Sequence, residues 1–115
     1  MNGHVNNVTF IQLLENARNR FVDLRTPLKR SEKMTFMLVH FEIDFVAQLF
    51  YRGAPEAACR LLELKRSSIT LGQAVFDGER PTAVARAVIV NVDRTQGRAT
   101  PFTDEARMVL ETRLP

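Results

Sequence analysis

The chain has 115 residues and a mass of 13.1 kDa, the size of one domain with a single hydrophobic core. Apolar residues make up 45% and charged residues 25%, and sixteen basic residues stand against thirteen acidic ones without a block of like charge, which argues against nucleic-acid binding. No apolar run approaches the roughly 18 residues that span a bilayer, and the polar start is unlike a signal peptide. Cys59 is the only cysteine, so we expect a cytoplasmic chain without an intramolecular disulfide, with Cys59 as a small buried side chain.

The first predicted element is a helix over residues 8–21. Its apolar side chains recur at spacings of three and four, which predicts one buried face. They are Phe10, Leu13, Leu14, Ala17 and Phe21, with Leu24 one turn further on. Asn6 and Asn7 stand just ahead of this pattern, and asparagine is a favoured N-cap because its side-chain oxygen accepts from a first-turn amide. Thr26-Pro27 ends the helix, since the residue before proline is forced out of helical geometry.

The middle of the chain is predicted to form four strands. In the first, over residues 35–49, apolar and polar side chains alternate with a period of two, which is typical of a strand with one solvated face. The apolar set is Val39, Phe41, Ile43 and Phe45, and the polar set is His40, Glu42 and Asp44. Successive polar side chains stand about 7 Å apart, too far for a tight metal site without other ligands. We therefore interpret the polar set as a solvated face.

The other strands are predicted over residues 57–64, 68–76 and 83–92. The second of these places four side chains on one face: Ile69, Leu71, Gln73 and Val75. Turns are predicted at Gly53-Ala54-Pro55, at Asp77-Gly78 and over residues 93–97. A short last helix begins near Thr103, where an acidic first turn precedes apolar residues. Strands joined by short turns are expected to be antiparallel neighbours, so the predicted fold class is α+β, a long helix packed on an antiparallel sheet.

The opening block Asn2-Gly3-His4-Val5-Asn6-Asn7 is the most specific motif of the chain. Together with Glu15, Ala17 and Arg18 on the helix, it resembles the active-site entrance of hotdog-fold thioesterases of the 4-hydroxybenzoyl-CoA thioesterase type. It is also similar to the D-x-N-x-H-V-N-N block of acyl-carrier-protein thioesterases. The resemblance implies a single hotdog domain over residues 1–115, in which an antiparallel sheet wraps around one central helix.

The chain departs from this family at its start. The family has an aspartate immediately before the position of Met1, preceded by a first strand, and in the acyl-CoA branch that aspartate is the main catalytic carboxylate. Two alternatives stay open. Either the true start lies upstream, which we favour because a globular domain rarely begins inside its own site, or the chain is a non-catalytic acyl-CoA-binding or assembly module.

Thioester hydrolysis needs an activated water or a nucleophile, and hydrogen-bond donors for the developing oxyanion. The resemblance implies catalytic roles for Asn2 and His4, and for Glu15 as a general base on the central helix. The alternatives are a frayed Asn2, a capping or packing His4, and a Glu15 that pairs along the helix with Arg18. Predicted substrate contacts are made by the backbone ahead of the helix, by apolar helix residues and by the turn before residue 69, namely Gly3, Val5, Asn6, Phe10, Arg66, Ser67 and Ser68.

The predicted reaction is the hydrolysis of acyl-CoA or acyl-carrier-protein thioesters, without a metal or cofactor. The acyl chain is expected beside Phe10, Leu14 or Phe41, and Arg52, Lys65 or Arg66 can contact coenzyme A phosphates. A homodimer or a dimer of dimers is expected, joined along the edge strand near residues 35–45. A dehydratase of the same fold is a third possibility, against which the opening block argues.

Overall fold

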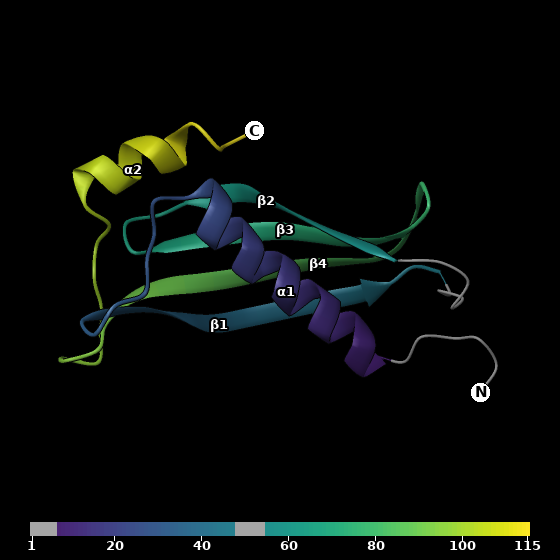
Figure 1. Ribbon diagram of the computed structural model, residues 1–115, viewed down its shortest axis with the longest axis horizontal. Helices are drawn as coiled ribbons and strands as arrows, with labels where there is room; N and C mark the ends of the chain where they lie inside the picture. The colour runs from purple at the N-terminus through teal and green to yellow at the C-terminus, as the bar shows by residue number, and fades with distance from the viewer. Residues whose placement is uncertain (1–6, 48–54) are drawn as a thin grey trace.

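The computed structural model describes residues 7–47 and 55–115, which form an antiparallel sheet with the long helix α1 lying diagonally across one face (Figure 1). The elements in chain order are α1 (Asn7–Arg25), β1 (Met34–Phe45), β2 (Glu56–Leu64), β3 (Ser68–Asp77), β4 (Arg80–Asp93), β5 (Arg98–Ala99) and α2 (Asp104–Glu111). The predicted α+β class, the long helix, the four main strands and the short last helix are confirmed. The two-residue strand β5, which pairs with the end of β4, was not predicted.

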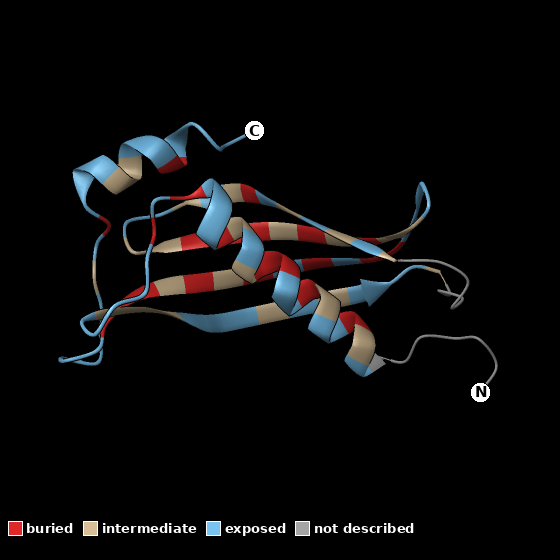
Figure 2. Ribbon diagram, viewed as in Figure 1, coloured by how far each residue is buried: buried red, intermediate tan, exposed pale blue. Residues whose placement is uncertain are grey.

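One stripe of α1 faces the sheet, as the three-and-four spacing predicts (Figure 2). The buried members are Phe10, Leu14, Ala17, Arg18 and Val22. Leu24 does not continue this stripe: its exposed fraction is 72%, because Val22 stands four residues after Arg18 and takes the inward position instead.

Local turn chemistry places the element ends. Thr26 Oγ1 donates to the Val22 carbonyl at 2.6 Å just after α1 ends, and Gly78 adopts a φ of +66° between β3 and β4. Thr103 is the N-cap of α2, with its hydroxyl accepting from the Ala106 amide at 3.1 Å. These three predicted boundaries are confirmed.

The order of strands in the sheet is β1-β4-β3-β2, so β1 and β2 lie at opposite edges. The prediction that all consecutive strands are neighbours is therefore wrong for this pair. The turns between β2 and β3 and between β3 and β4 are tight enough for hairpins, whereas β1 and β2 are separated in the sequence by residues 46–55. Residues 48–54 lie outside the described residues, and with them Leu49, Arg52 and the predicted turn at Gly53-Ala54.

Strand β1 is shorter and less regular than predicted. It ends at Phe45 rather than Leu49, and its register with β4 shifts between Leu38 and His40, so Val39 is an extra residue in a β-bulge. The bulge breaks the predicted alternation. Phe41 and Ile43 face the core, whereas Val39 is 57% exposed, next to the exposed Met37 and Leu38.

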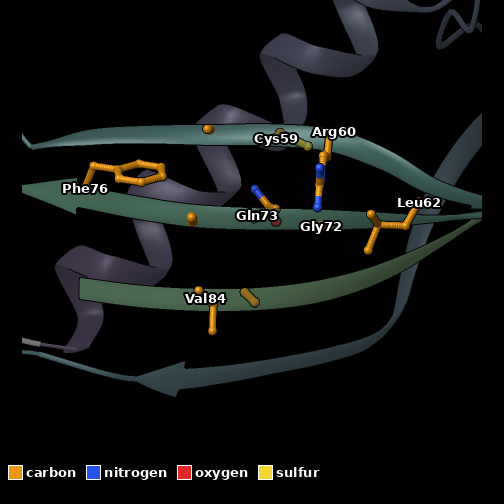
Figure 3. A pocket seen from close by; sticks show the side chains of 10 residues that line it. Cys59, Arg60, Leu62, Gly72, Gln73, Phe76 and Val84 are labelled. Atoms are coloured by element: carbon orange, nitrogen blue, oxygen red, sulfur yellow. The ribbon is translucent and has the colours of Figure 1, made fainter. Parts of the chain in front are cut away.

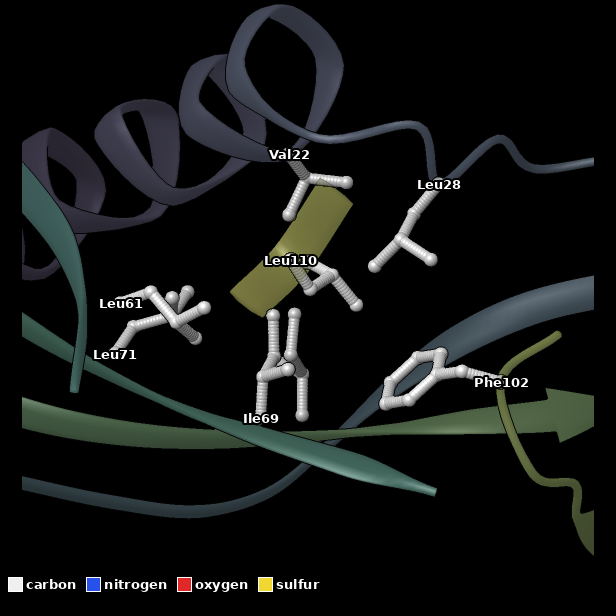
Figure 4. Packing of buried hydrophobic residues seen from close by; sticks show 8 residues of the cluster. Val22, Leu28, Leu61, Ile69, Leu71, Phe102 and Leu110 are labelled. Carbon is white, nitrogen blue, oxygen red and sulfur yellow. The ribbon is translucent and has the colours of Figure 1, made fainter. Parts of the chain in front are cut away.

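The space between α1 and the sheet holds two hydrophobic clusters. One, at the amino end of α1, contains Phe10, Leu14, Val75, Ala83 and Ala85. The other joins the end of α1, the sheet and α2, as Figure 4 shows, and contains Val22, Leu28, Leu61, Ile69, Leu71, Ile89, Phe102 and Leu110. The second cluster therefore fixes the carboxyl-terminal segment against the sheet.

Candidate active site

The amino end of α1 is held beside the end of β1 and the β3–β4 hairpin. The Phe10 ring, 3% exposed, stands edge-on to the Phe45 ring, with 5.1 Å between centroids and an interplanar angle of 89°. Leu14, one turn later, is fully buried in the same cluster as Val75. The first turn of α1 contains no acidic side chain. The partial positive charge of the backbone amides in this turn is therefore not neutralised by a carboxylate of the same turn.

The predicted site residues of the opening block, Asn2, Gly3, His4, Val5 and Asn6, lie outside the described residues and directly precede α1 in the chain. Phe10 and Leu14, which were predicted to contact the acyl chain, are buried core residues. Phe41, the third residue predicted to contact it, is partly buried against them. The roles predicted for all of these residues stay predictions.

The predicted contacts Arg66 and Ser67 lie in the β2–β3 turn and Ser68 begins β3, at the opposite end of the sheet from the start of α1. The Ser67 carbonyl accepts from the Asn91 amide at 2.8 Å, and the Arg66 carbonyl accepts from the Phe102 amide at 3.1 Å. One chain therefore does not bring this turn together with the opening block.

Glu15 is exposed on α1, about two turns from the helix start. It makes no salt bridge with the residues that the structure describes, although its charge acts on Arg18, three positions later. Its carboxylate is thus accessible on the surface of the helix, as both the general-base and the helix-pairing interpretations require.

Arg18, which the sequence analysis names as part of the helix motif and as a possible partner of Glu15, is a buried polar residue. Its exposed fraction is 8%; Nη1 donates to Gln73 Oε1 at 3.0 Å, and its guanidinium carbon lies 5.2 Å from the centroid of the Phe41 ring. Gln73 Nε2 in turn donates to the Leu14 carbonyl at 2.8 Å. Burial lowers the pKa of Arg18, with the charge of Glu15 opposing this shift. The sequence does contain a signal for the burial of Arg18, since Arg18 stands four residues after Leu14 and so on the same face of the helix.

Cys59 packs beside the core but is only partly buried, whereas a buried side chain was predicted. Burial raises its thiol pKa to about 12, and Arg18 opposes this shift. The group is therefore a neutral thiol near pH 7 and has no thiolate character for nucleophilic attack.

His40, Glu42 and Asp44 are exposed on β1, which confirms the solvated strand face. His40 Nε2 lies 3.4 Å from Glu42 Oε1, and both side chains are more than half exposed. Over residues 7–47 and 55–115, no three potential ligands cluster tightly enough to hold a metal ion.

A groove of about 400 Å³ lies at the end of the molecule where α1 terminates. It runs between the α1–β1 connection and the segment that leads into α2. Its lining includes Pro27, Leu28, Lys29, Lys33, Met34, Phe36, Asn91, Asp93, Pro101 and Phe102. Sequence reasoning missed this site, because its parts are far apart in the chain and no local motif marks them.

A second hollow of about 470 Å³ lies on the sheet face opposite α1. Figure 3 shows the side chains of Leu62, Phe76 and Val84 among its lining residues, which also include the small residues Gly72 and Ala74. Leu62 covers Gly72 so closely that a Cβ at residue 72 would stand 2.8 Å from Leu62 Cδ1. The glycine thus lets Leu62 lie flat on the sheet.

The long helix on a curved antiparallel sheet is the hotdog arrangement. The chain belongs to the thioesterase-like superfamily, whose model matches residues 1–110. No curated protein matches the sequence significantly. In the described part of the chain, no helix has both the length and the apolar character needed to cross a membrane.

Solved structures with this fold include the PA5185 protein from Pseudomonas aeruginosa, which is 29% identical, with a TM-score of 0.82 over 97% of this chain and 80% of its own. A predicted thioesterase from Bacillus stearothermophilus is 25% identical, with a TM-score of 0.85 over 98% and 85% of the two chains. A thioesterase from Thermus thermophilus, complexed with coenzyme A and Zn, is 25% identical, with a TM-score of 0.79 over 94% and 84%.

Proposed function

We propose that this chain hydrolyses acyl thioesters of coenzyme A in the cytoplasm, in fatty acid metabolism. Water adds to the thioester carbonyl carbon, the carbon–sulfur bond breaks, and a carboxylic acid and a thiol are released. The observation that carries this proposal is the family match over residues 1–110, which includes the opening block directly ahead of α1. The coenzyme A in the Thermus thermophilus neighbour supports the choice of carrier, and the free thiol Cys59 fits a reducing compartment.

In this proposal, the backbone amides of Gly3 to Val5 and the amino end of α1 stabilise the oxyanion, because helix amides without intrahelical acceptors bind negative charge. His4 orients the attacking water, and Asn2 holds it or the thioester carbonyl. Glu15 acts as the general base, presented from the exposed surface of α1. The absence of a carboxylate from the first turn of α1 supports the binding of a negatively charged group at the amino end of this helix.

Replacing His4 with alanine is expected to lower kcat for acyl-CoA by about 100-fold or more, the usual contribution of a positioned acid–base group. Release of free coenzyme A, followed with a thiol-reactive dye over a series of acyl chain lengths, measures this effect. His40, the other histidine of the chain, supplies the control. His40→Ala alters an exposed side chain on β1 and is expected to leave kcat within about twofold of the original value.

Equal rates for the two histidine variants would contradict the role of His4. Tight binding of acyl-CoA without turnover by the unmodified chain would instead support the non-catalytic binding module. Glu15→Gln separates the two interpretations of that residue. Loss of a general base lowers kcat, whereas loss of a helix-pairing residue changes the free energy of unfolding by only about 0.3–0.5 kcal/mol.

We further propose that two copies pair antiparallel along β1. In the described residues, β1 is hydrogen-bonded to a neighbouring strand only on the side of β4. Met37, Leu38 and Val39 are 52%, 46% and 57% exposed at this edge. An apolar strand edge of this kind is a surface for pairing with another strand, and a two-fold axis joins two such edges without leaving one open. A dimer of dimers would add a second contact.

Val39→Lys is expected to weaken this dimer by about 2 kcal/mol, or roughly 30-fold in Kd, because it buries a charge at the centre of the interface. Sedimentation equilibrium or light scattering over a range of protein concentrations measures Kd. Met108→Lys is the control, since Met108 is 69% exposed on α2, away from β1. A monomeric unmodified chain at all concentrations, or equal effects of both variants, would overturn the proposed dimer.

A further inference from the structure

Strand β2 has an open edge. It lies at one end of the sheet, and in the described residues it is hydrogen-bonded to a neighbouring strand only on the side of β3 (Figure 1). The run from Glu56 to Leu61 pairs regularly with β3, and the register shifts only after Leu61, so about 20 Å of regular strand edge is available. Backbone amides and carbonyls that point away from β3 along this edge can pair with another extended chain.

A groove of about 310 Å³ lies between β2 and α1. Ala57 and Cys59 of β2 line it and pack against the two core clusters, yet both are only half-buried. Their side chains are small, so they leave space beside the helix. On α1, Phe21 is half-buried and Leu24 is 72% exposed along the same groove. The helix therefore presents apolar surface that the four main strands do not cover.

The groove beside β2 is positively charged. The charged residues in its described lining are both arginines, Arg20 and Arg25. Both are exposed, and neither forms a salt bridge with the residues that the structure describes. Arg20 stands four residues before Leu24, and Arg25 stands four residues after Phe21, so each arginine shares a helix face with one of the apolar side chains. A chain that enters this groove therefore meets apolar surface and positive charge side by side.

We propose that the open edge of β2 binds an extended, acidic segment of a partner protein by strand addition. The backbone of the partner would extend the sheet, and its apolar side chains would cover Phe21 and Leu24. Its carboxylates would accept hydrogen bonds from Arg20 and Arg25. The surface does not depend on the proposed thioester chemistry, because none of these four residues has a predicted role in catalysis or substrate binding. It also leaves β1, at the opposite edge, free for the proposed dimer.

A second copy of this chain fits the β2 edge less well than an acidic segment does. Antiparallel pairing of two β2 strands about a two-fold axis would put both α1 helices on the same face of the joined sheet. Arg20 and Arg25 of one copy would then face the same arginines of the other copy, and no acidic residue in the described lining of the groove would offset the repulsion. An acidic segment removes this repulsion and uses the same charges for binding.

The probe is a fluorescently labelled, capped peptide, Thr-Val-Thr-Glu-Thr-Val-Thr, which as a strand places valine, glutamate and valine on one face. We expect saturable binding by fluorescence anisotropy. Binding should weaken at least about fivefold when the protein carries Arg20→Gln/Arg25→Gln, or when lysine replaces the glutamate of the peptide, because charge-assisted contacts are lost. The matched control Arg30→Gln/Arg98→Gln removes two exposed arginines from outside the groove lining and should change Kd less than twofold.

Amide hydrogen exchange, followed by NMR, locates the bound peptide. With saturating peptide, the amides of residues 56–61 that point away from β3 should exchange at least about 10-fold more slowly, and those of β1 should not change.

Three results would overturn the proposal. The first is that the peptide does not bind, or binds without slowing exchange in residues 56–61. The second is an equal loss of affinity in the two double variants. The third is slow exchange of the same amides before the peptide is added, which would mean that the edge is already covered. A second copy covers it if the protection falls on dilution, and another segment of the protein covers it if the protection does not.

Discussion

Gln73→Leu is expected to lower the free energy of unfolding by about 3 kcal/mol. Gln73 is 5% exposed and accepts the hydrogen bond from Arg18 Nη1 at 3.0 Å. Leucine fills a similar volume but offers no acceptor, so the Arg18 guanidinium would keep its charge in an apolar site with only the Phe41 ring as a described partner. Urea denaturation followed by circular dichroism measures the change as a shift in the transition midpoint.

Two further variants separate the loss of this hydrogen bond from a general packing defect. Arg18→Met/Gln73→Leu removes the buried charge together with its acceptor and should be at least about 1 kcal/mol more stable than Gln73→Leu alone, because nothing polar is then stranded. Arg20→Met changes an exposed arginine of the same helix and should stay within about 0.5 kcal/mol of the original. If the double variant is no more stable than Gln73→Leu, the proposed cause is wrong.

Leu71→Ala is expected to lower the free energy of unfolding by about 3–4 kcal/mol. Leu71 is fully buried in the middle of β3, in the cluster that also includes Leu61, Ile69 and Leu110. The loss combines the burial energy of the deleted atoms with the cavity that rigid β-strands leave unfilled. Midpoint and slope of urea unfolding, measured together, show whether the unfolding remains two-state.

Leu24→Ala is the matched control for this deletion. Leu24 is 72% exposed on α1, so the same substitution should change stability by less than about 0.5 kcal/mol. Comparable losses for the two variants would mean that Leu24 is buried in solution, for example by a second copy. A loss below about 1.5 kcal/mol for Leu71→Ala would instead indicate that the core collapses around the missing atoms.

The elements of this fold were predictable where their causes are local. The spacing of Phe10, Leu14 and Ala17, the turn at Asp77-Gly78 and the N-cap Thr103 each depend on residues a few positions apart. The strand order was not predictable in the same way. Alternation shows that residues 34–45 form a strand, but it does not show whether β4 or β2 lies beside it, since this pairing is decided by packing over the whole sheet.

In the candidate site, too, the parts that depend on neighbouring residues were predictable and the parts that depend on tertiary packing were not. The opening block is a contiguous motif, so the sequence alone identified the family that the comparisons confirm. The sequence placed Gln73 on the apolar face of its strand and named Arg18 as a possible partner of Glu15, and only the fold shows that Arg18 donates to Gln73. The groove combines residues 27–36, 91–93 and 100–106, whose proximity follows from tertiary packing and leaves no local signature.

The exposed edge of β1 has a consequence for how such an enzyme would respond to its surroundings. In the proposed dimer the β1 edges of two copies meet, and any ligand that binds only the associated form strengthens the association by mass action. A ligand at 100 times its Kd would favour the paired state by about 2.7 kcal/mol. Dilution would then inactivate the protein without unfolding it, and substrate would protect it, so that turnover would depend on how much of the chain a cell makes.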